Sequence, residues 1–168
     1  VLALGHDTLE SFTAPVRLDS IAPKYDLNSP SQVRAFLYDD PLLRTYAMHA
    51  YGKGAGKYYA GMKKKLAAVL KRSHPKNRDL FQYAYALADC LSEKADLGND
   101  AYRAYRAGNK AALKAILKRI PRAITAIDRV WATRRKLWMA EFKPFGMDEL
   151  DRRFGGAIYR MKVMQGVL

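Results

Sequence analysis

The feature that most constrains the fold is the recurrence of apolar residues at spacings of three and four along most of the chain. It is clearest in the stripe formed by Phe81, Ala84, Tyr85, Ala88, Leu91 and Ala95. Such spacing places side chains on one face of a helix, and the alternating runs that form half-buried strands are absent from the sequence. We therefore expect an all-α fold, a bundle of about five to seven helices with short connections.

Proline, glycine and capping residues divide this pattern and set the expected helix ends. Ser29 and Pro30 begin a first short helix, and Pro41 ends it. We expect Pro121 to kink or divide a long segment capped by Gly108 and Asn109, because proline lacks a backbone donor. A second helix is expected to open at Pro41, with Leu42, Leu43 and Tyr46, and to end at a break at 52–56. A corner is expected at Gly98-Asn99, followed by a short helix at 100–107. The remaining expected features are a helix end near 73–75, an N-cap at Asn77 and a last helix at 147–168.

Two parts of the chain differ in pattern. Residues 1–28 contain Pro15 and Pro23 and have no sustained period, so we interpret them as an extended leader or linker. Residues 29–168 form the expected helical domain. The chain opens at Val1 without Met, and we expect it to be a fragment of a longer protein. No run of 18 apolar residues is present, so we expect no transmembrane segment.

The net charge of +14 is concentrated in two segments. Residues 53–78 hold 9 basic and no acidic residues, residues 101–141 hold 11 and 2, and residues 79–100 between them hold 1 and 5. Basic segments of this kind can bind an anionic partner such as nucleic acid. They also occur on solvated surfaces and on surfaces that contact an acidic neighbouring domain. No nucleic-acid motif accompanies it, so we favour the second interpretation. The alternative is a basic nucleic-acid-binding module that uses Lys63, Lys64, Lys65, Arg72, Arg134 and Arg135.

The sequence offers no self-contained active site. Its single cysteine, Cys90, lies beside the apolar stripe and is expected to be a buried, inert thiol. The adjacent carboxylates Asp39-Asp40 and Asp148-Glu149 stand near expected helix starts, where they complement the helix dipole. No ligand spacing relates the histidines, His6, His49 and His74. We therefore expect no catalytic residue, no metal ion and no cofactor in this chain.

The most distinctive stretch is a motif in the last third of the chain. It reads LWMAEFKPFG from residue 137 to 146, and the residues of interest are Trp138, Glu141, Lys143, Pro144, Phe145, Gly146, Asp151, Arg153, Gly155, Gly156 and Arg160. A long helix, a turn with proline and glycine, and a helix with a glycine pair form an expected hairpin. We expect the glycine pair to allow close approach of a neighbouring backbone.

The motif contains one large aromatic residue and several charged ones. We expect Trp138 to lie in the core, with stacking on a sugar as the alternative. Glu141 is expected to close the hairpin through a partly buried ion pair with Arg153 or Arg160. On this interpretation the motif is structural.

The motif resembles the pattern LW..ENKPFG followed by D.R.GG...R in the C-terminal helical domain of a subgroup of family 20 glycoside hydrolases, the exo-β-N-acetylhexosaminidases. The segment Asp40-Pro41-Leu42-Leu43 is similar to the D-P-L-L that opens that domain. Phe142 stands where the pattern has Asn, which puts any contact of that Asn in doubt. The family's catalytic Asp-Glu pair follows H-x-G-x, which Asp148-Glu149 lacks, so the pair carries no catalytic role here.

The resemblance implies a non-catalytic accessory domain of a bacterial β-N-acetylhexosaminidase, joined by residues 1–28 to an upstream catalytic barrel. Such a parent would hydrolyse terminal β-linked N-acetylhexosamine by substrate-assisted catalysis, with the acetamido group of the substrate as nucleophile. The expected partners are the barrel of the same parent chain and, in a homodimer, a second copy. Nucleic acid and membrane are not expected as partners. Because no targeting segment is visible, we expect the bacterial cytoplasm.

Overall fold

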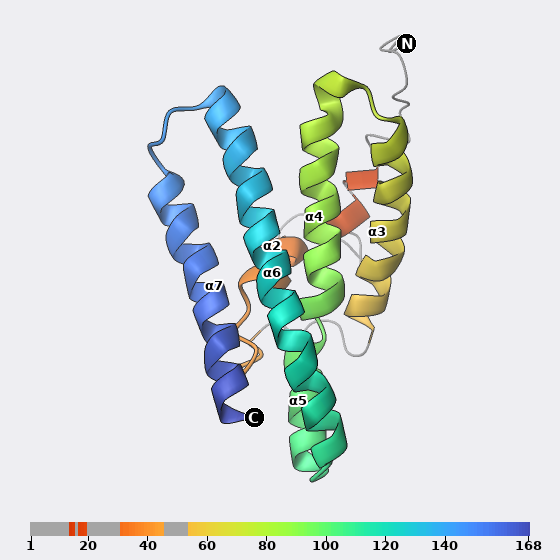
Figure 1. Ribbon diagram of the computed structural model, residues 1–168, viewed down its shortest axis with the longest axis vertical. Helices are drawn as coiled ribbons and strands as arrows, with labels where there is room; N and C mark the ends of the chain where they lie inside the picture. Colours follow the sequence, from red (N-terminus) through yellow and green to blue (C-terminus); the bar gives the residue numbers. More distant parts are fainter. Residues whose placement is uncertain (1–13, 16, 20–30, 46–53) are drawn as a thin grey trace.

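The computed structural model describes residues 14–15, 17–19, 31–45 and 54–168, and in it the α-helices pack side by side into an elongated bundle (Figure 1). No strand occurs among these residues, so the expected all-α fold is confirmed. The elements are η1 (Arg17–Asp19), α2 (Gln32–Tyr38), α3 (Ala55–Arg72), η2 (Pro75–Asn77), α4 (Arg78–Lys94), α5 (Leu97–Arg106), α6 (Lys110–Glu141) and α7 (Met147–Val167).

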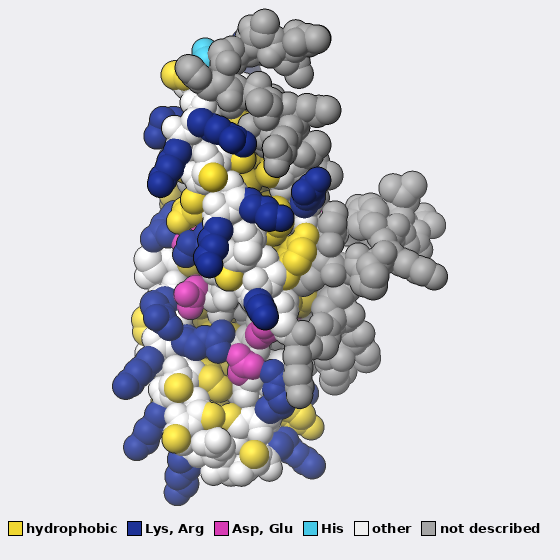
Figure 2. Space-filling view, turned by 90° about the vertical axis from the view of Figure 1, so that its right-hand side faces the viewer, with side chains coloured by type: hydrophobic (Ala, Val, Ile, Leu, Met, Phe, Trp, Pro, Cys, Tyr) yellow, Lys and Arg dark blue, Asp and Glu magenta, His cyan; other side chains and the backbone are white. Residues whose placement is uncertain are grey.

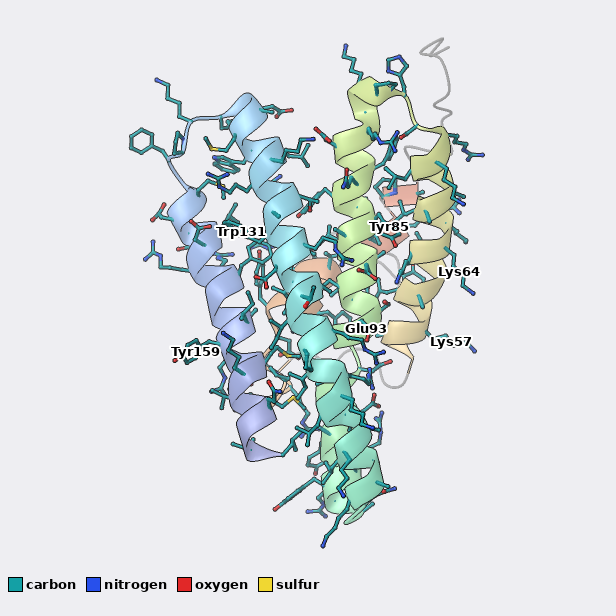
Figure 3. The ribbon with its side chains drawn as sticks, viewed as in Figure 1. Lys57, Lys64, Tyr85, Glu93, Trp131 and Tyr159 are labelled. Atoms are coloured by element: carbon teal, nitrogen blue, oxygen red, sulfur yellow. The ribbon has the colours of Figure 1, made fainter. Side chains whose placement is uncertain are left out.

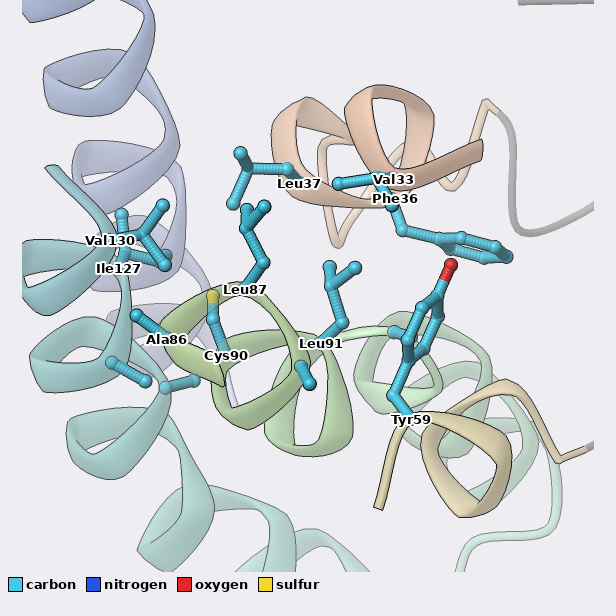
Figure 4. Close-up of a cluster of buried hydrophobic side chains, with 14 of the residues drawn as sticks. Val33, Phe36, Leu37, Tyr59, Ala86, Leu87, Cys90, Leu91, Ile127 and Val130 are labelled. Carbon is cyan, nitrogen blue, oxygen red and sulfur yellow. The ribbon is translucent and has the colours of Figure 1, made fainter. Parts of the chain in front are cut away.

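Helix α4 occupies the centre of the bundle, because α2, α3, α5 and α6 all pack against it. The close-up in Figure 4 shows its side chains between those of α6 on one side and those of α2 and α3 on the other. The predicted stripe is confirmed, since its members are buried except for the half-buried Tyr85: Phe81, Ala84, Ala88, Leu91 and Ala95.

A buried lysine joins α4 to α2. The side chain of Lys94 is buried, and its Nζ donates to the carbonyl oxygens of Phe36 and Asp39, both at 2.7 Å. These carbonyls lie at the C-terminal end of α2, where backbone acceptors lack partners within the helix and attract a positive charge. Burial lowers the pKa of Lys94. The ammonium group therefore caps α2 from inside the core.

Helix α2 begins later than the sequence indicated. Its N-cap is Ser31, whose hydroxyl oxygen accepts from the amide of Arg34 at 3.2 Å. The expected cap at Ser29-Pro30 lies outside the described residues. The hydroxyl of Ser31 donates to the carboxylate of Asp19 at 3.0 Å, and the amide of Val33 donates to the same carboxylate at 2.8 Å. Element η1, part of the expected leader, therefore packs on the bundle.

The prediction of a second helix at Pro41 was wrong, because the described chain makes only a single turn there. The carboxylate of Asp40 accepts from the amides of Leu42 and Leu43 at 2.8 and 3.3 Å, which satisfies the first donors of that turn. Arg44 then adopts a left-handed conformation with φ 56°, and this conformation cannot continue a right-handed helix. Tyr46 lies outside the described residues.

The predicted corner at Gly98-Asn99 was also wrong, since both residues lie in the first turn of α5. A Cβ atom on Gly98 would lie 2.4 Å from the carbonyl oxygen of Pro41. Glycine is therefore needed here for the close approach of another segment and does not break the helix. Helix α3 likewise begins at Ala55, inside the expected break, after Gly54 with φ 110°.

Helix α6 is a single helix from Lys110 to Glu141, so the expected division at Pro121 was wrong, while a kink there stays a prediction. Pro121 is exposed, so its ring lies outside the buried stripe of the helix. The apolar stripe continues on both sides of it, with Ile120 and Ile127 fully buried. Packing against α4 therefore keeps the two halves in one helix.

Replacing Gly98 by alanine is expected to lower the free energy of unfolding by about 1–3 kcal/mol, because the new methyl group would clash with the Pro41 carbonyl. Gly61 is the matched control, since a Cβ there meets nothing within 4 Å. We expect Gly61→Ala in α3 to raise the free energy of unfolding by about 0.5–1 kcal/mol. Urea denaturation of both variants measures the difference, and equal effects would contradict the close approach.

Candidate functional site

The carboxylate of Asp89 on α4 links three helices. Its two oxygens pair with Nζ of Lys63 on α3 and with a guanidinium nitrogen of Arg129 on α6, both at 2.5 Å. The side chain of Asp89 is only 10% exposed, so both cations reach inward to it. The hydrogen bond with Asp89 raises the pKa of Lys63. Part of the basic excess of α3 and α6 is thus paired with a carboxylate of α4.

Further ion pairs follow the seam between α4 and α6. Lys136 pairs with Asp79 at 2.7 Å, and Arg122 pairs with Glu93 at 3.7 Å. Because these cations are largely exposed, each pair contributes little to stability. Their arrangement nevertheless explains why an acidic segment lies between two basic ones in the sequence.

The six cations considered for anion binding lie on two helices that flank α4. Lys64, Lys65 and Arg72 are exposed on α3, and Figure 2 shows basic side chains spread over that side of the molecule. In Figure 3, Lys57 and Lys64 point away from the bundle. Because Lys63 is held by Asp89, the cations of α3 that are open to a partner are those on its outer face.

The two arginines of this set lie over aromatic rings. The guanidinium of Arg134 lies 5.4 Å from the ring centre of Trp138, and that of Arg135 lies 6.0 Å from the ring centre of Trp131. Contacts of this kind use the positive charge within the domain. Binding of nucleic acid by the six cations stays a prediction.

The turn between α6 and α7 is held by the side chain of Trp138. Its indole nitrogen donates to the carbonyl oxygen of Lys143 at 2.9 Å, and its ring centre lies 5.0 Å from that of Phe142. Gly146 has φ 88°, and a Cβ atom there would lie 3.2 Å from a ring carbon of Trp138. Trp138 is half-buried and belongs neither to the core cluster nor to the side chains packed against it, so the expectation that it lies in the core was wrong.

This turn presents large apolar side chains to solvent. Phe145 is 85% exposed and Phe142 is 57% exposed, although the turn that carries them is held by Trp138. Large aromatic side chains normally contribute to cores and interfaces. An exposed pair on a supported turn is therefore a candidate contact surface.

The expected ion pair of Glu141 with Arg153 or Arg160 was wrong. Arg153 instead pairs with Glu149 on its own helix at 2.8 Å, and Arg160 pairs with Asp40 in the turn that follows α2. Glu141 is exposed at the end of α6, away from the partly buried position that such a pair needs. Arg160 nevertheless supports a structural role for the motif, because its ion pair joins α7 to the Asp40 turn.

A second motif residue joins α7 to α6. The carboxylate of Asp151 accepts from the indole nitrogen of Trp131 at 2.6 Å. Figure 3 shows Trp131 between these two helices. The polar partner of Trp131 could not be read from the sequence.

The glycine pair of α7 does not allow close packing of a neighbouring helix. A Cβ atom on Gly155 or Gly156 would meet nothing within 4 Å, so the expectation of close backbone approach was wrong. Gly156 instead lines a cleft between α2 and α7. Arg34 and Tyr38 of this cleft share a face of α2 at a spacing of four, a local signal for the site. The polar residues of the cleft that no sequence motif indicated are Ser31, Arg34, Tyr38 and Arg152.

Cys90 and His74, which were also considered for catalysis or metal binding, take part in the packing and hydrogen bonding of the fold. Cys90 is buried as expected, and burial raises the pKa of its thiol to about 12. The Nδ1 atom of His74 accepts from the amide of Lys76 at 3.2 Å, while His6 and His49 lie outside the described residues. Within the described part of the chain, no group of three or more His, Cys, Asp or Glu side chains could hold a metal ion, and no helix combines the length and apolar character of a membrane span.

The comparisons with known proteins decide the family. The family model described as the glycoside hydrolase 20C C-terminal domain matches residues 10–168. The chain belongs to this family. No curated protein matches the sequence. The match begins within the expected leader, before η1, and it includes every described element from η1 to α7.

In this glycoside hydrolase 20C C-terminal domain, the motif residues have two kinds of surroundings. Trp138, Gly146, Asp151 and Arg160 contact other parts of the domain and stabilise the α6–α7 hairpin or join it to the Asp40 turn. The others face solvent or the cleft between α2 and α7, as do Phe145, Gly155 and Gly156. The second group is the one available for a partner or ligand.

The carboxyl group of Asp40 is expected to make stability depend on pH. Partial burial acts to raise its pKa, but hydrogen bonds from Arg160 and from the amides of Leu42 and Leu43 outweigh this effect, so the pKa lies below its ordinary value of 3.8. A lowered pKa means that the contribution of Asp40 is present above about pH 4 and is lost as the pH falls through the folded-state pKa.

Replacing Asp40 by asparagine is therefore expected to lower the free energy of unfolding by about 1–2 kcal/mol at neutral pH. The difference from the unchanged chain should shrink towards zero on acidification below the folded-state pKa. Urea denaturation at several pH values measures it. The matched control is Asp148→Asn, whose side chain is 74% exposed in its pair with Arg152. A loss that is independent of pH would contradict the role of the Asp40 carboxylate.

Proposed function

We propose that this chain is a non-catalytic accessory domain that packs on the catalytic barrel of a β-N-acetylhexosaminidase through the α6–α7 turn. The observation that carries the proposal is the exposure of Phe142 and Phe145 on a turn that Trp138 holds in place. A flexible loop with exposed aromatic residues would lose conformational entropy on docking. A turn that is already ordered avoids most of that loss.

The chemistry of the turn suits the centre of a protein interface. Such centres are enriched in aromatic residues, methionine and arginine, and depleted in lysine and glutamate. Met139, near the end of α6, is 41% exposed, and Arg134 lies over the Trp138 ring. The turn also carries the exposed Glu141 and Lys143, but it differs from the lysine-rich outer face of α3, where no large hydrophobic side chain is exposed. We therefore place the barrel at the α6–α7 turn.

The surroundings of the carboxyl groups support a domain without a catalytic role. Asp40 caps a turn and pairs with Arg160, while Asp148 and Glu149 pair with arginines of α7. The contacts of Asp40 lower its pKa, so this carboxyl group stays ionised at neutral pH and does not act as a general acid. Asp148 and Glu149 lie exposed in the first turn of α7. The parent would hydrolyse terminal β-linked N-acetylhexosamine with carboxyl groups of its barrel, using the acetamido group of the substrate as nucleophile.

The double variant Phe142→Ala/Phe145→Ala tests the docking surface in the full-length parent. We expect the helical domain to separate from the barrel, seen in calorimetry as an additional unfolding transition at lower temperature, because the interface loses two anchoring side chains. Tyr159→Ala is the matched control, since Tyr159 is an exposed aromatic residue of α7 that points away from the bundle (Figure 3). It should leave the parent with its original transitions.

Two measurements on the isolated chain complete the test. The double variant should change its free energy of unfolding by about 1 kcal/mol or less, because both side chains are largely exposed. The isolated chain should not turn over a chromogenic N-acetylglucosaminide. Turnover would contradict the non-catalytic role. Dimerisation of the isolated chain that the double variant abolishes would assign the turn to a second copy.

A further inference from the structure

The cleft between α2 and α7 has a volume of about 500 Å³. Its floor includes the buried small residues Ala35 and Ala157, and its rim carries polar side chains from both helices. The polar members are Ser31, Arg34, Tyr38, Arg152 and Arg153. Three guanidinium groups from two helices therefore line one concave surface.

The arginines of α7 are held only weakly by their present partners. Arg152 pairs with Asp148 at 2.9 Å and with Glu149 at 3.4 Å, and Arg153 pairs with Glu149 at 2.8 Å, all within one helix and with exposed side chains on both sides. Pairs of this kind contribute only about 0.3–0.5 kcal/mol each. A ligand that offers several oxygens can therefore compete for these guanidinium groups at little energetic expense.

The opposite wall supplies further donors. Arg34 lies on the exposed face of α2, one turn before Tyr38. The guanidinium of Arg153 lies 6.0 Å from the ring centre of Tyr38. Burial raises the pKa of Tyr38, although the charges of Arg153 and Arg34 oppose the shift, so the phenol is neutral at pH 7 and can donate a hydrogen bond.

Packing against a neighbour does not explain why residue 156 is a glycine, but its position beside the cleft does. A glycine inside a helix costs about 1 kcal/mol relative to alanine, and no neighbouring backbone or side chain requires one here. Its backbone borders the cleft instead. The lack of a side chain leaves that wall open to a bound group.

We propose that the α2–α7 cleft binds an oxyanion, a phosphate or a carboxylate, between the guanidinium groups of Arg34 on one helix and Arg152 and Arg153 on the other. Guanidinium groups bind such anions through paired, charge-assisted hydrogen bonds. The source of the anion is a small molecule or an acidic side chain of another domain, which offer the same chemistry. The proposal is independent of docking at the α6–α7 turn, which lies beyond the N-terminal end of α7.

Titration of the isolated chain with inorganic phosphate, followed by amide resonances in NMR at constant ionic strength, tests the proposal. We expect saturable shifts at Gly156 and at residues of α2. The double variant Arg34→Gln/Arg153→Gln should weaken binding about tenfold or more, because it removes two charge-assisted contacts. Arg106→Gln, at an exposed arginine of α5 outside the cleft, is the matched control and should leave the affinity unchanged.

A variant that fills the cleft separates binding from folding. Gly156→Leu should abolish the shifts without lowering the melting temperature, because leucine favours the helix and its side chain enters the open space. A parallel titration with citrate distinguishes the anions, since a response to citrate but not phosphate indicates a carboxylate ligand. The same titrations of the full-length parent distinguish the source, since a cleft already filled by an acidic side chain of another domain would no longer respond. Shifts that do not saturate, that persist in Gly156→Leu, or that fall mainly on the lysines of α3 would overturn the proposal.

Discussion

The whole bundle depends on the burial of α4 against its neighbours on several sides. A helix in this position must carry apolar side chains around much of its circumference, and small ones where a neighbour approaches closely. Ala84, Ala88 and Cys90 meet that requirement. Asp89 and Lys94 are buried charged exceptions. The charge of Lys94 is accommodated because two carbonyl oxygens at the end of α2 accept its hydrogen bonds. The same residue thereby fixes where α2 lies.

The uneven charge follows from this central position. Because α3 and α6 flank α4, acidic side chains at its edges can meet basic ones from both neighbours, as Asp89 does with Lys63 and Arg129. The cations left over lie on outer faces, and those of α3 have no carboxylate on their own helix. A net charge of +14 is therefore compatible with a domain that binds no nucleic acid.

Some residues of the family motif stabilise the fold, and others make no contact that the fold needs. Trp138 and Arg160 make contacts that hold the hairpin and join α7 to the Asp40 turn. Phe145 and Gly156 stabilise nothing visible within the domain, since one is exposed and the other borders an open cleft. A structural reason for every motif residue was expected from the sequence, and it holds only for the first group.

The sequence by itself determined the all-α class, the core stripe of α4 and the membership in a family, because periodicity and motif are local properties of the chain. Tertiary structure alone decided which charges meet, as Asp40 and Arg160 do across 120 residues. It also decided that Gly98 admits a neighbouring carbonyl while Gly156 borders a cleft. Both are glycines within helices, and their roles differ because a glycine permits close approach without specifying what approaches.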